Sequence, residues 1–323
     1  MIKPISGSWF EFQHFFDVEG KYWNAECARF SGADWRIKIS EIAQIGITQL
    51  VLMNVACHNK AYYDTGIFPK FPLGCEDPVE AVLGAADEFG MSFFVGLGYF
   101  TPANSPLWMI NEPADVKRRL QAMNEIAERY GHHKSFTGWY WPHEASIWSR
   151  LKEGFLQYVN TCSAEARKLT PGKRILIAPY GTRTVVPDDE YVRQLEQLDV
   201  DVVAYQDEVG VEKTRIEELP AIYEKLRNVH DRVPQRKLYA DVEIFRFEGL
   251  VYRSALIPAP FERVRRQLEI ASDYADAIFV YQYQGMMNKP DSLAFAGHPE
   301  SPALYSDYTG WRQEGKTAQT CNE

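Results

Sequence analysis

The chain has 323 residues, of which 46% are hydrophobic and 24% are charged, so it is long enough to bury a large core. Its net charge of -9 and its pI near 5.4 argue against a general nucleic-acid binder, which needs clustered Lys and Arg to contact phosphates. No apolar run approaches the ~20 residues that a membrane span needs. These properties favour a neutral polar substrate, with no nucleic-acid partner and no membrane insertion.

The cysteines and the start of the chain say little about compartment. The five cysteines are scattered without a CxxC pair, so their spacing indicates neither a zinc site nor a disulfide framework. The start lacks a basic segment followed by a long apolar stretch, which predicts a cytoplasmic protein for the sequence as given. A periplasmic or secreted location stays open, because a signal peptide can be removed. The sequence does not determine the oligomeric state.

Apolar runs that suit β-strands alternate with amphipathic helical patterns along the chain. Parallel strands joined by helical crossovers produce this alternation, and it occurs eight times. We therefore predict an α/β fold, a (β/α)8 TIM barrel, as a single domain over residues 1–323, with 286–323 as a C-terminal extension covering the barrel edge. The expected strands are residues 5–12, 47–54, 91–99, 136–141, 174–179, 200–205, 237–244 and 277–283.

Local signals support the helices between these strands. Gly46 follows the expected helix 33–44, and Gly131 follows the helix 113–130; glycine commonly ends a helix. Asp77 and Pro78 begin another helix, since Asp can cap it and Pro can occupy its first turn. Further helices are expected at 150–169, 215–228 and 260–274.

Two glutamates follow strands of this predicted barrel. Glu144 comes directly after strand four and Glu243 closes strand seven. In a barrel, residues at the strand carboxyl ends face one shared mouth, so we expect these carboxyl groups to lie in the same site. Glycoside hydrolysis needs a proton donor and a nucleophile, which two carboxyl groups can supply. The pair predicts a hydrolase that acts on an oligo- or polysaccharide.

Three segments carry a resemblance to known barrels. Residues 136–144 (FTGWYWPHE), 201–207 (DVVAYQD) and 240–245 (ADVEIF) resemble an uncharacterised family of bacterial barrels, glycosyl-hydrolase-like domains of unknown function. The two glutamates on strands four and seven resemble those of the clan A retaining glycoside hydrolases. This resemblance implies that Glu144 is the general acid/base and Glu243 the nucleophile of a double-displacement mechanism.

The chain departs from the clan pattern just before the acid/base. Clan A enzymes usually carry Asn there, which hydrogen-bonds the sugar 2-hydroxyl, whereas this chain has His143. We expect His143 either to contact the substrate, to orient Glu144 or to be a structural histidine.

Other polar residues near strand ends are candidates for substrate binding. Gln206 and Asp207 end strand six, and Asp207 can hold a sugar hydroxyl or tune a neighbouring pKa. Glu11, near the end of strand one, is a candidate for the deepest subsite. Asp241 shares a strand face with Glu243 and lies one layer deeper, where we expect it either to position that glutamate or to have a structural role. Glu208 is expected to be an exposed loop residue.

Aromatic residues make up 14% of the chain and gather after the strands. Sugar rings pack on aromatic faces, although large aromatics also fill ordinary cores. We expect Trp141 and Tyr205 to bind substrate because each lies beside a polar candidate, and we add Tyr281 from the last strand. Trp23 and Trp35 are expected to be packing residues.

Two alternatives to a hydrolase stay open. A metal-dependent sugar isomerase or epimerase could use Glu144, Asp207 and Glu243 as ligands, although strands five to eight offer no histidine. A non-catalytic saccharide-binding barrel is the other alternative, because a fold does not prove an activity. We predict no metal and no cofactor.

Overall fold

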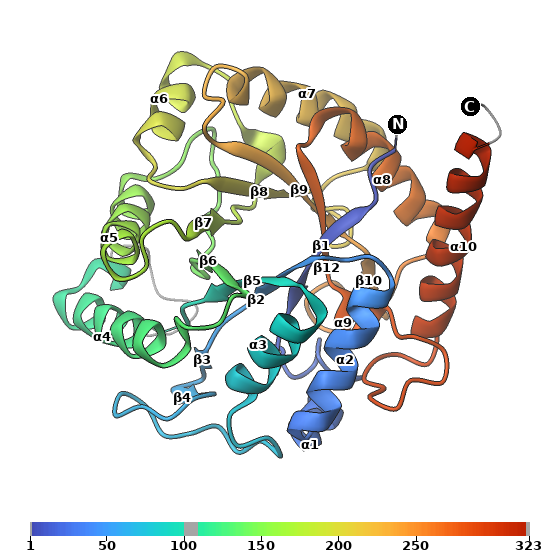
Figure 1. Ribbon diagram of the computed structural model, residues 1–323. Helices are drawn as coiled ribbons and strands as arrows, with labels where there is room; N and C mark the ends of the chain where they lie inside the picture. Colours follow the sequence, from blue (N-terminus) through green and yellow to red (C-terminus); the bar gives the residue numbers. More distant parts are fainter. Residues whose placement is uncertain (1, 100–108, 321–323) are drawn as a thin grey trace.

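The computed structural model describes residues 2–99 and 109–320, and its centre is a closed barrel of eight parallel strands (Figure 1). Around the barrel the strands run in chain order, and the last pairs with the first through Ser8 and Val280. This confirms the predicted (β/α)8 TIM barrel. The barrel strands are β1 (Ile5–Phe10), β2 (Gln49–Leu52), β5 (Ser92–Gly96), β6 (Phe136–Tyr140), β7 (Arg174–Ile177), β8 (Val202–Gln206), β9 (Lys237–Glu243) and β12 (Ala277–Tyr281).

Helices form a ring outside the strands (Figure 1). They start at local signals that the sequence carries: the Ser31 hydroxyl and the Asp34 carboxylate form a capping box, and Asp77 accepts the Glu80 amide at 3.0 Å. The helices are α1 (Asn24–Arg29), α2 (Gly32–Gln44), α3 (Pro78–Phe89), α4 (Pro113–Tyr130), α5 (Glu153–Leu169), α6 (Asp189–Gln197), α7 (Leu219–His230), α8 (Phe261–Tyr274), α9 (Tyr283–Met286) and α10 (Ser301–Thr320).

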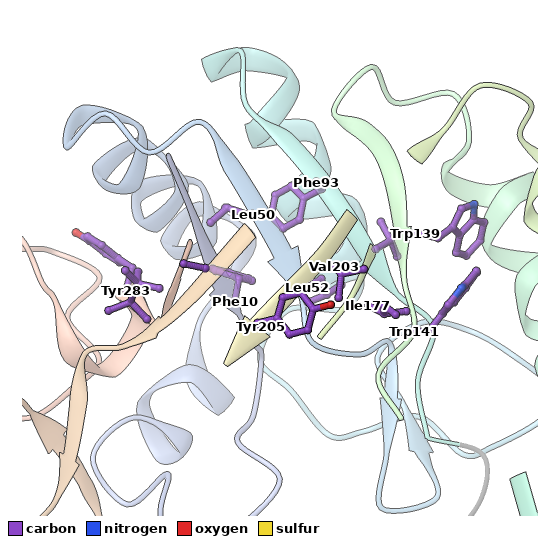
Figure 2. Packing of buried hydrophobic residues seen from close by; sticks show 14 of the residues in the cluster. Phe10, Leu50, Leu52, Phe93, Trp139, Trp141, Ile177, Val203, Tyr205 and Tyr283 are labelled. Atoms are coloured by element: carbon purple, nitrogen blue, oxygen red, sulfur yellow. The ribbon is translucent and has the colours of Figure 1, made fainter. Parts of the chain in front are cut away.

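Side chains alternate between the barrel interior and the helix layer, as the two-residue period of a strand requires. Tyr140 points inward, where its ring meets Trp9 edge-on at 6.1 Å. Its neighbours Trp139 and Trp141 belong to the outer core and stack on each other at 6.0 Å (Figure 2). The interior is filled by Trp9, Val51, Phe94, Tyr140, Leu176, Ala178, Val202, Ala204, Tyr239 and Phe279.

Two short antiparallel hairpins follow barrel strands at their carboxyl ends. One, β3 (Ala56–Cys57) with β4 (Lys60–Ala61), follows β2. The other, β10 (Phe245–Phe247) with β11 (Leu256–Pro258), follows β9 and therefore extends the barrel next to Glu243. No helix in the described part of the chain is long and apolar enough to cross a membrane.

The C-terminal extension ends in the long helix α10 at the side of the barrel (Figure 1). The Tyr308 hydroxyl accepts a hydrogen bond from the Ile5 amide at 2.9 Å, and Arg312 donates to the Ile45 carbonyl at 2.6 Å. Ile5 begins β1, and Ile45 lies in the turn that leads into β2. The helix therefore contacts the barrel near the amino ends of its strands.

Candidate active site

A cavity of about 450 Å³ lies at the carboxyl ends of the barrel strands. A cavity of this size falls in the ordinary range for small-molecule sites. Strand ends and the residues just after them contribute Glu11, Asn54, Glu144, Gln206, Asp241, Glu243 and Tyr281. Loops and the β10–β11 hairpin contribute His14, Glu19, Tyr99, His143, Tyr180, Glu208, Lys213, Phe245 and Tyr252, among others.

Glu144 reaches the cavity from the segment that follows β6. The Tyr140 hydroxyl, from the interior of the same strand, donates a hydrogen bond to its carboxylate at 3.1 Å. Burial raises the pKa of Glu144 to about 7, although hydrogen bonds from Gln206 and Tyr140 and the charge of Lys213 act in the opposite direction. A carboxyl group with this pKa can carry a proton near neutral pH, as a general acid must.

Glu243 ends β9 and lines the same cavity. Its carboxylate accepts the Val211 amide at 2.9 Å, while its backbone amide donates to Asp207 at 3.2 Å. Burial and the charge of Asp207 raise the pKa of Glu243 to about 8, against the effect of the Val211 hydrogen bond. Arg263 lies behind the site and donates to the Glu243 carbonyl at 2.8 Å.

Asp207 does not line the cavity among the described residues, in contrast to the expectation that it faces the mouth. It is only 2% exposed and lies behind Glu243, where Gln267 donates to it at 2.7 Å and the Val209 amide at 3.2 Å. This position fits the other role expected for Asp207, which is to change the pKa of a neighbouring group. Gln206, by contrast, lines the cavity next to Glu144.

Glu208 is buried, whereas the sequence predicted an exposed loop residue. It is only 1% exposed and lines the cavity, and its backbone takes a positive φ of 54°. Lys213 lies 3.9 Å from the Glu208 carboxylate, and its ammonium lies over the rings of Tyr180 and Tyr252. The sequence alone does not mark Lys213, Tyr180 and Tyr252 as a group, because only the fold of the loops brings them together.

Asp241 lines the cavity one layer below Glu243, as its strand position predicts. It is 2% exposed, and one carboxyl oxygen is buried without a hydrogen-bond partner in the described structure. Burial and the charges of Glu243, Asp207 and Glu144 hold the pKa of Asp241 well above its ordinary value. A proton on Asp241 would relieve the repulsion between these carboxylates.

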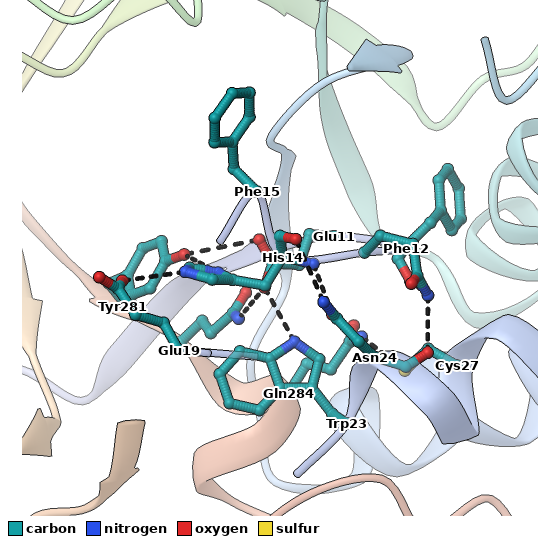
Figure 3. Close-up of polar contacts among 12 residues, drawn as sticks. Glu11, Phe12, His14, Phe15, Glu19, Trp23, Asn24, Cys27, Tyr281 and Gln284 are labelled. Carbon is teal, nitrogen blue, oxygen red and sulfur yellow. Dashed lines mark hydrogen bonds and ion pairs between the residues drawn. The ribbon is translucent and has the colours of Figure 1, made fainter. Parts of the chain in front are cut away.

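Glu11 lies in a hydrogen-bonded network at the wall of the cavity (Figure 3). The His14 ring bonds Glu11 at 2.9 Å through Nδ1 and Glu19 at 3.1 Å through Nε2. Trp23 and Gln282 donate to Glu11 at 2.9 and 2.7 Å. These partners hold the Glu11 carboxylate in one orientation.

His14 carries a positive charge in this network. Burial alone would lower its pKa, but the charges of Glu11 and Glu19 and their hydrogen bonds raise the pKa of His14 to about 9. The Tyr281 hydroxyl lies 3.1 Å from the His14 ring, so Tyr281 joins this wall and lines the cavity as expected.

His143 is buried between two tyrosine rings and also lines the cavity. Tyr99 and Tyr158 meet its ring edge-on at 5.2 and 5.3 Å. Burial, helped by the charge of Arg119, lowers the pKa of His143 to about 3, so the ring is neutral at ordinary pH. This position is compatible with each of the three roles expected for it.

Trp141 and Tyr205 do not lie where the predicted contact with substrate would require. Both are fully buried and belong to the outer core (Figure 2). Neither lines the cavity among the described residues. The Trp141 indole donates to Ser163 of α5 at 3.1 Å, and the Tyr205 hydroxyl bonds His230 of α7 at 3.0 Å. Both side chains therefore fasten strands to helices. Trp23 and Trp35 are buried packing residues, as predicted.

The acids suggested for a metal-dependent isomerase are not gathered as a ligand set. Within the described ranges, Glu144, Asp207 and Glu243 do not appear together as a group of converging ligand atoms, and Asp207 does not line the cavity. The cavity brings together Glu11, His143, Glu144, Gln206, Glu243 and Tyr281 from the predicted site residues.

Comparisons with known proteins agree with this architecture. The model of a protein family described as "Domain of unknown function (DUF4434)" matches residues 5–294. A search of the curated proteins found no match. Among solved structures, a Bacteroides thetaiotaomicron protein provisionally assigned as an alpha-L-fucosidase is similar with a TM-score of 0.75 and 19% identity, over 96% of this chain and 93% of that one.

Two further solved structures are similar at lower identity. An endo-beta-1,4-mannanase from Thermotoga petrophila has a TM-score of 0.61 and 9% identity, over 96% of this chain and 76% of that one. A GH5_18 protein from Streptomyces cattleya, solved with GlcNAc, has a TM-score of 0.60 and 13% identity, over 97% and 82%. At these identities the likeness establishes the barrel fold, and function has to be argued from the site.

Proposed function

This chain belongs to the DUF4434 family, and we propose that it is a glycoside hydrolase that cleaves a glycosidic bond in an oligo- or polysaccharide. The observation that carries the proposal is that Glu144 and Glu243, from strands four and seven of the barrel, line one cavity. The names of the structurally similar proteins, a mannanase and a GH5_18 protein among them, support a saccharide substrate by analogy of fold.

The proposed mechanism retains the anomeric configuration. Glu144 donates its proton to the glycosidic oxygen while the Glu243 carboxylate attacks the anomeric carbon, so the leaving group departs as an alcohol and a glycosyl ester forms on Glu243. Glu144, now ionised, takes a proton from water, whose oxygen attacks the anomeric carbon and releases Glu243. A retaining enzyme holds the two carboxyl groups about 5–5.5 Å apart, which is the geometry this mechanism requires.

The surroundings favour the proposed role of Glu144 and act on Glu243 in both directions. The raised pKa of Glu144 keeps a proton available, while the Val211 amide favours the ionised form of Glu243. Burial and the charge of Asp207 act against that ionisation and raise the pKa of Glu243 above its ordinary value.

The test compares leaving groups in Glu144→Gln and Glu243→Gln variants. A dinitrophenyl leaving group needs no proton, so Glu144→Gln should still form the glycosyl enzyme from such a substrate, whereas its rate on oligosaccharides should fall by about 10²–10⁴-fold. Glu243→Gln should lose turnover on both kinds of substrate. Glu224→Gln, on the exposed face of α7, serves as the control and should behave as wild type.

The product stereochemistry tests the mechanism separately. Proton NMR of the first product should give the anomer of the substrate. Inversion would reject the double displacement, while near-wild-type turnover by Glu243→Gln would reject the nucleophile. Saccharide binding without turnover, unchanged in both variants, would instead favour a non-catalytic barrel.

A further inference from the structure

A second group of ligand-type side chains lies away from the cavity. Glu80 on α3, with His132 and His133 in the segment between α4 and β6, brings one carboxylate oxygen and two ring nitrogens within 4.8 Å of one another. Within residues 2–99 and 109–320, no other set of three His, Cys, Asp or Glu side chains converges in this way. This group plays no part in the proposed hydrolysis.

His133 is held in the orientation that a metal ligand needs. Its Nδ1 lies 2.7 Å from Asp87, and its Nε2 points at Glu80 at 3.1 Å. Asp87 is itself fixed, because its other oxygen accepts the Ser135 amide at 2.6 Å. A histidine that binds a metal through one nitrogen commonly donates its other N–H to a carboxylate, which fixes the tautomer and the ring plane.

The remaining ligands can close on the ion with small movements. The 3.1 Å between His133 Nε2 and Glu80 is already close to the ~3.3 Å between two ligands of a tetrahedral ion with bonds of ~2.0–2.1 Å. Glu80 and His132 are exposed, so their side chains can rotate. The His132 ring lies 4.2 Å from the His133 ring, centre to centre.

The charge and the ligand types select the ion. Two carboxylates, Glu80 and Asp87, lie on either side of the His133 ring, and such an acidic surrounding suits a divalent cation. Two imidazoles and one carboxylate suit Zn²⁺, whereas Mg²⁺ and Ca²⁺ prefer oxygen ligands. We propose that Glu80, His132 and His133 bind one Zn²⁺ ion, with water completing the tetrahedron and Asp87 orienting His133.

The location of this site indicates a structural role. Residues 131–135 connect the end of α4 to the start of β6, and such segments lie at the amino ends of the strands, opposite the cavity. Bound Zn²⁺ would fasten this connection to α3. Because an ion that binds only the folded chain stabilises it, Zn²⁺ should raise the thermal midpoint and leave catalysis unchanged.

Calorimetric titration of the chelator-treated full chain with Zn²⁺ tests the proposal. Wild type should bind one ion, whereas His132→Ala and Glu80→Gln, both at exposed positions and therefore expected to fold, should lose at least tenfold in affinity. Asp87→Asn keeps an acceptor for the Ser135 amide and should lose about 10–100-fold. His298→Ala, a histidine outside this group, is the matched control and should bind as wild type.

Each possible result either supports or overturns the proposed Zn²⁺ site. Zn²⁺ binding that is weakened by His132→Ala and Glu80→Gln but not by His298→Ala, together with a rise in thermal midpoint in the same proteins, would support it. Zn²⁺ binding that survives both substitutions would overturn it, as would an absence of binding by wild type. Equal binding of Mg²⁺ would overturn the choice of ion.

Discussion

The backbone amide of Glu243 donates a hydrogen bond to Asp207 at 3.2 Å, so the carboxylate at the end of β8 lies directly behind the proposed nucleophile on β9. Asp207 therefore both positions Glu243 and, through its negative charge, raises the pKa of the Glu243 carboxyl group. The pKa of Asp207 itself is about 6, raised by burial, so this charge is present near neutral pH. A substitution that keeps the shape of Asp207 but removes its charge separates its effect on the position of Glu243 from its effect on the pKa of Glu243.

Asp207→Asn should move the pH optimum of kcat/KM downward. The optimum lies at the mean of the pKa values of Glu144 and Glu243, both of which are raised above their ordinary values. Without the charge of Asp207 the pKa of Glu243 falls, and the mean falls with it. The measurement is the pH dependence of kcat/KM. Asp276→Asn, which removes an acid at the amino end of β9, should leave the optimum unchanged, and an unmoved optimum in Asp207→Asn would reject the coupling.

Tyr140→Phe should move the same optimum in the opposite direction. The Tyr140 hydroxyl stabilises the ionised Glu144 through the 3.1 Å hydrogen bond, so its removal raises the pKa of Glu144 further. A higher pKa keeps the acid protonated to higher pH and moves the alkaline limb of the profile upward. A matched Tyr239→Phe variant, also in the barrel interior, controls for repacking. A downward shift in Tyr140→Phe would contradict the assignment of Glu144 as the acid.

His14 should make stability depend on pH. Its folded pKa of about 9 lies above the ordinary 6.5, so the stabilisation from Glu11 and Glu19 is complete below pH 6.5 and is lost as the pH rises through 9. The shift corresponds to a contribution of the order of 3 kcal/mol to the free energy of unfolding. Urea unfolding of wild type and His14→Gln at about pH 6 and about pH 9.5 measures it. The difference between the two proteins should shrink at the higher pH; a constant difference would contradict the charged state of His14.

The sequence predicted the barrel because each strand and helix carries its own local pattern. Hydrophobic runs, caps such as Asp77 with Pro78, and glycines after helices lie within a few residues of one another, so they can be recognised without knowing the fold. The positions of Glu144 and Glu243 after apolar strands follow from the same pattern.

Features that depend on contacts between distant segments were not predicted. Glu208 is buried because its loop folds back over the cavity beside Lys213, and nothing local in the sequence marks this. The network around Glu11 needs Gln282 from the other end of the chain. The hairpin of β10 and β11 has short strands with a long connection, which gives only a weak pattern.

The alternation of side chains along a strand, which can be read from the sequence, does indicate which way Trp141 and Tyr205 point. Successive side chains of a strand point to opposite faces, so a residue next to an inward-facing one points outward. Gln206 faces the cavity and Tyr205 therefore faces α7; Tyr140 faces the interior and Trp141 therefore faces α5. The prediction that both aromatics contact substrate therefore placed them on the wrong face of their strands.

Trp141→Phe and Tyr281→Phe should accordingly affect different quantities. Trp141→Phe loses the 3.1 Å hydrogen bond to Ser163 and part of the stacking on Trp139, which should reduce the free energy of unfolding by about 1–3 kcal/mol without changing KM.

Tyr281→Phe removes a hydroxyl that reaches the cavity wall, so a lost hydrogen bond to substrate should raise KM by roughly 2–12-fold. Urea unfolding and steady-state kinetics on the same preparations measure both effects. Because each variant controls for the other, a raised KM in Trp141→Phe with unchanged stability would mean that the indole contacts substrate, and that the outward face of β6 is assigned wrongly.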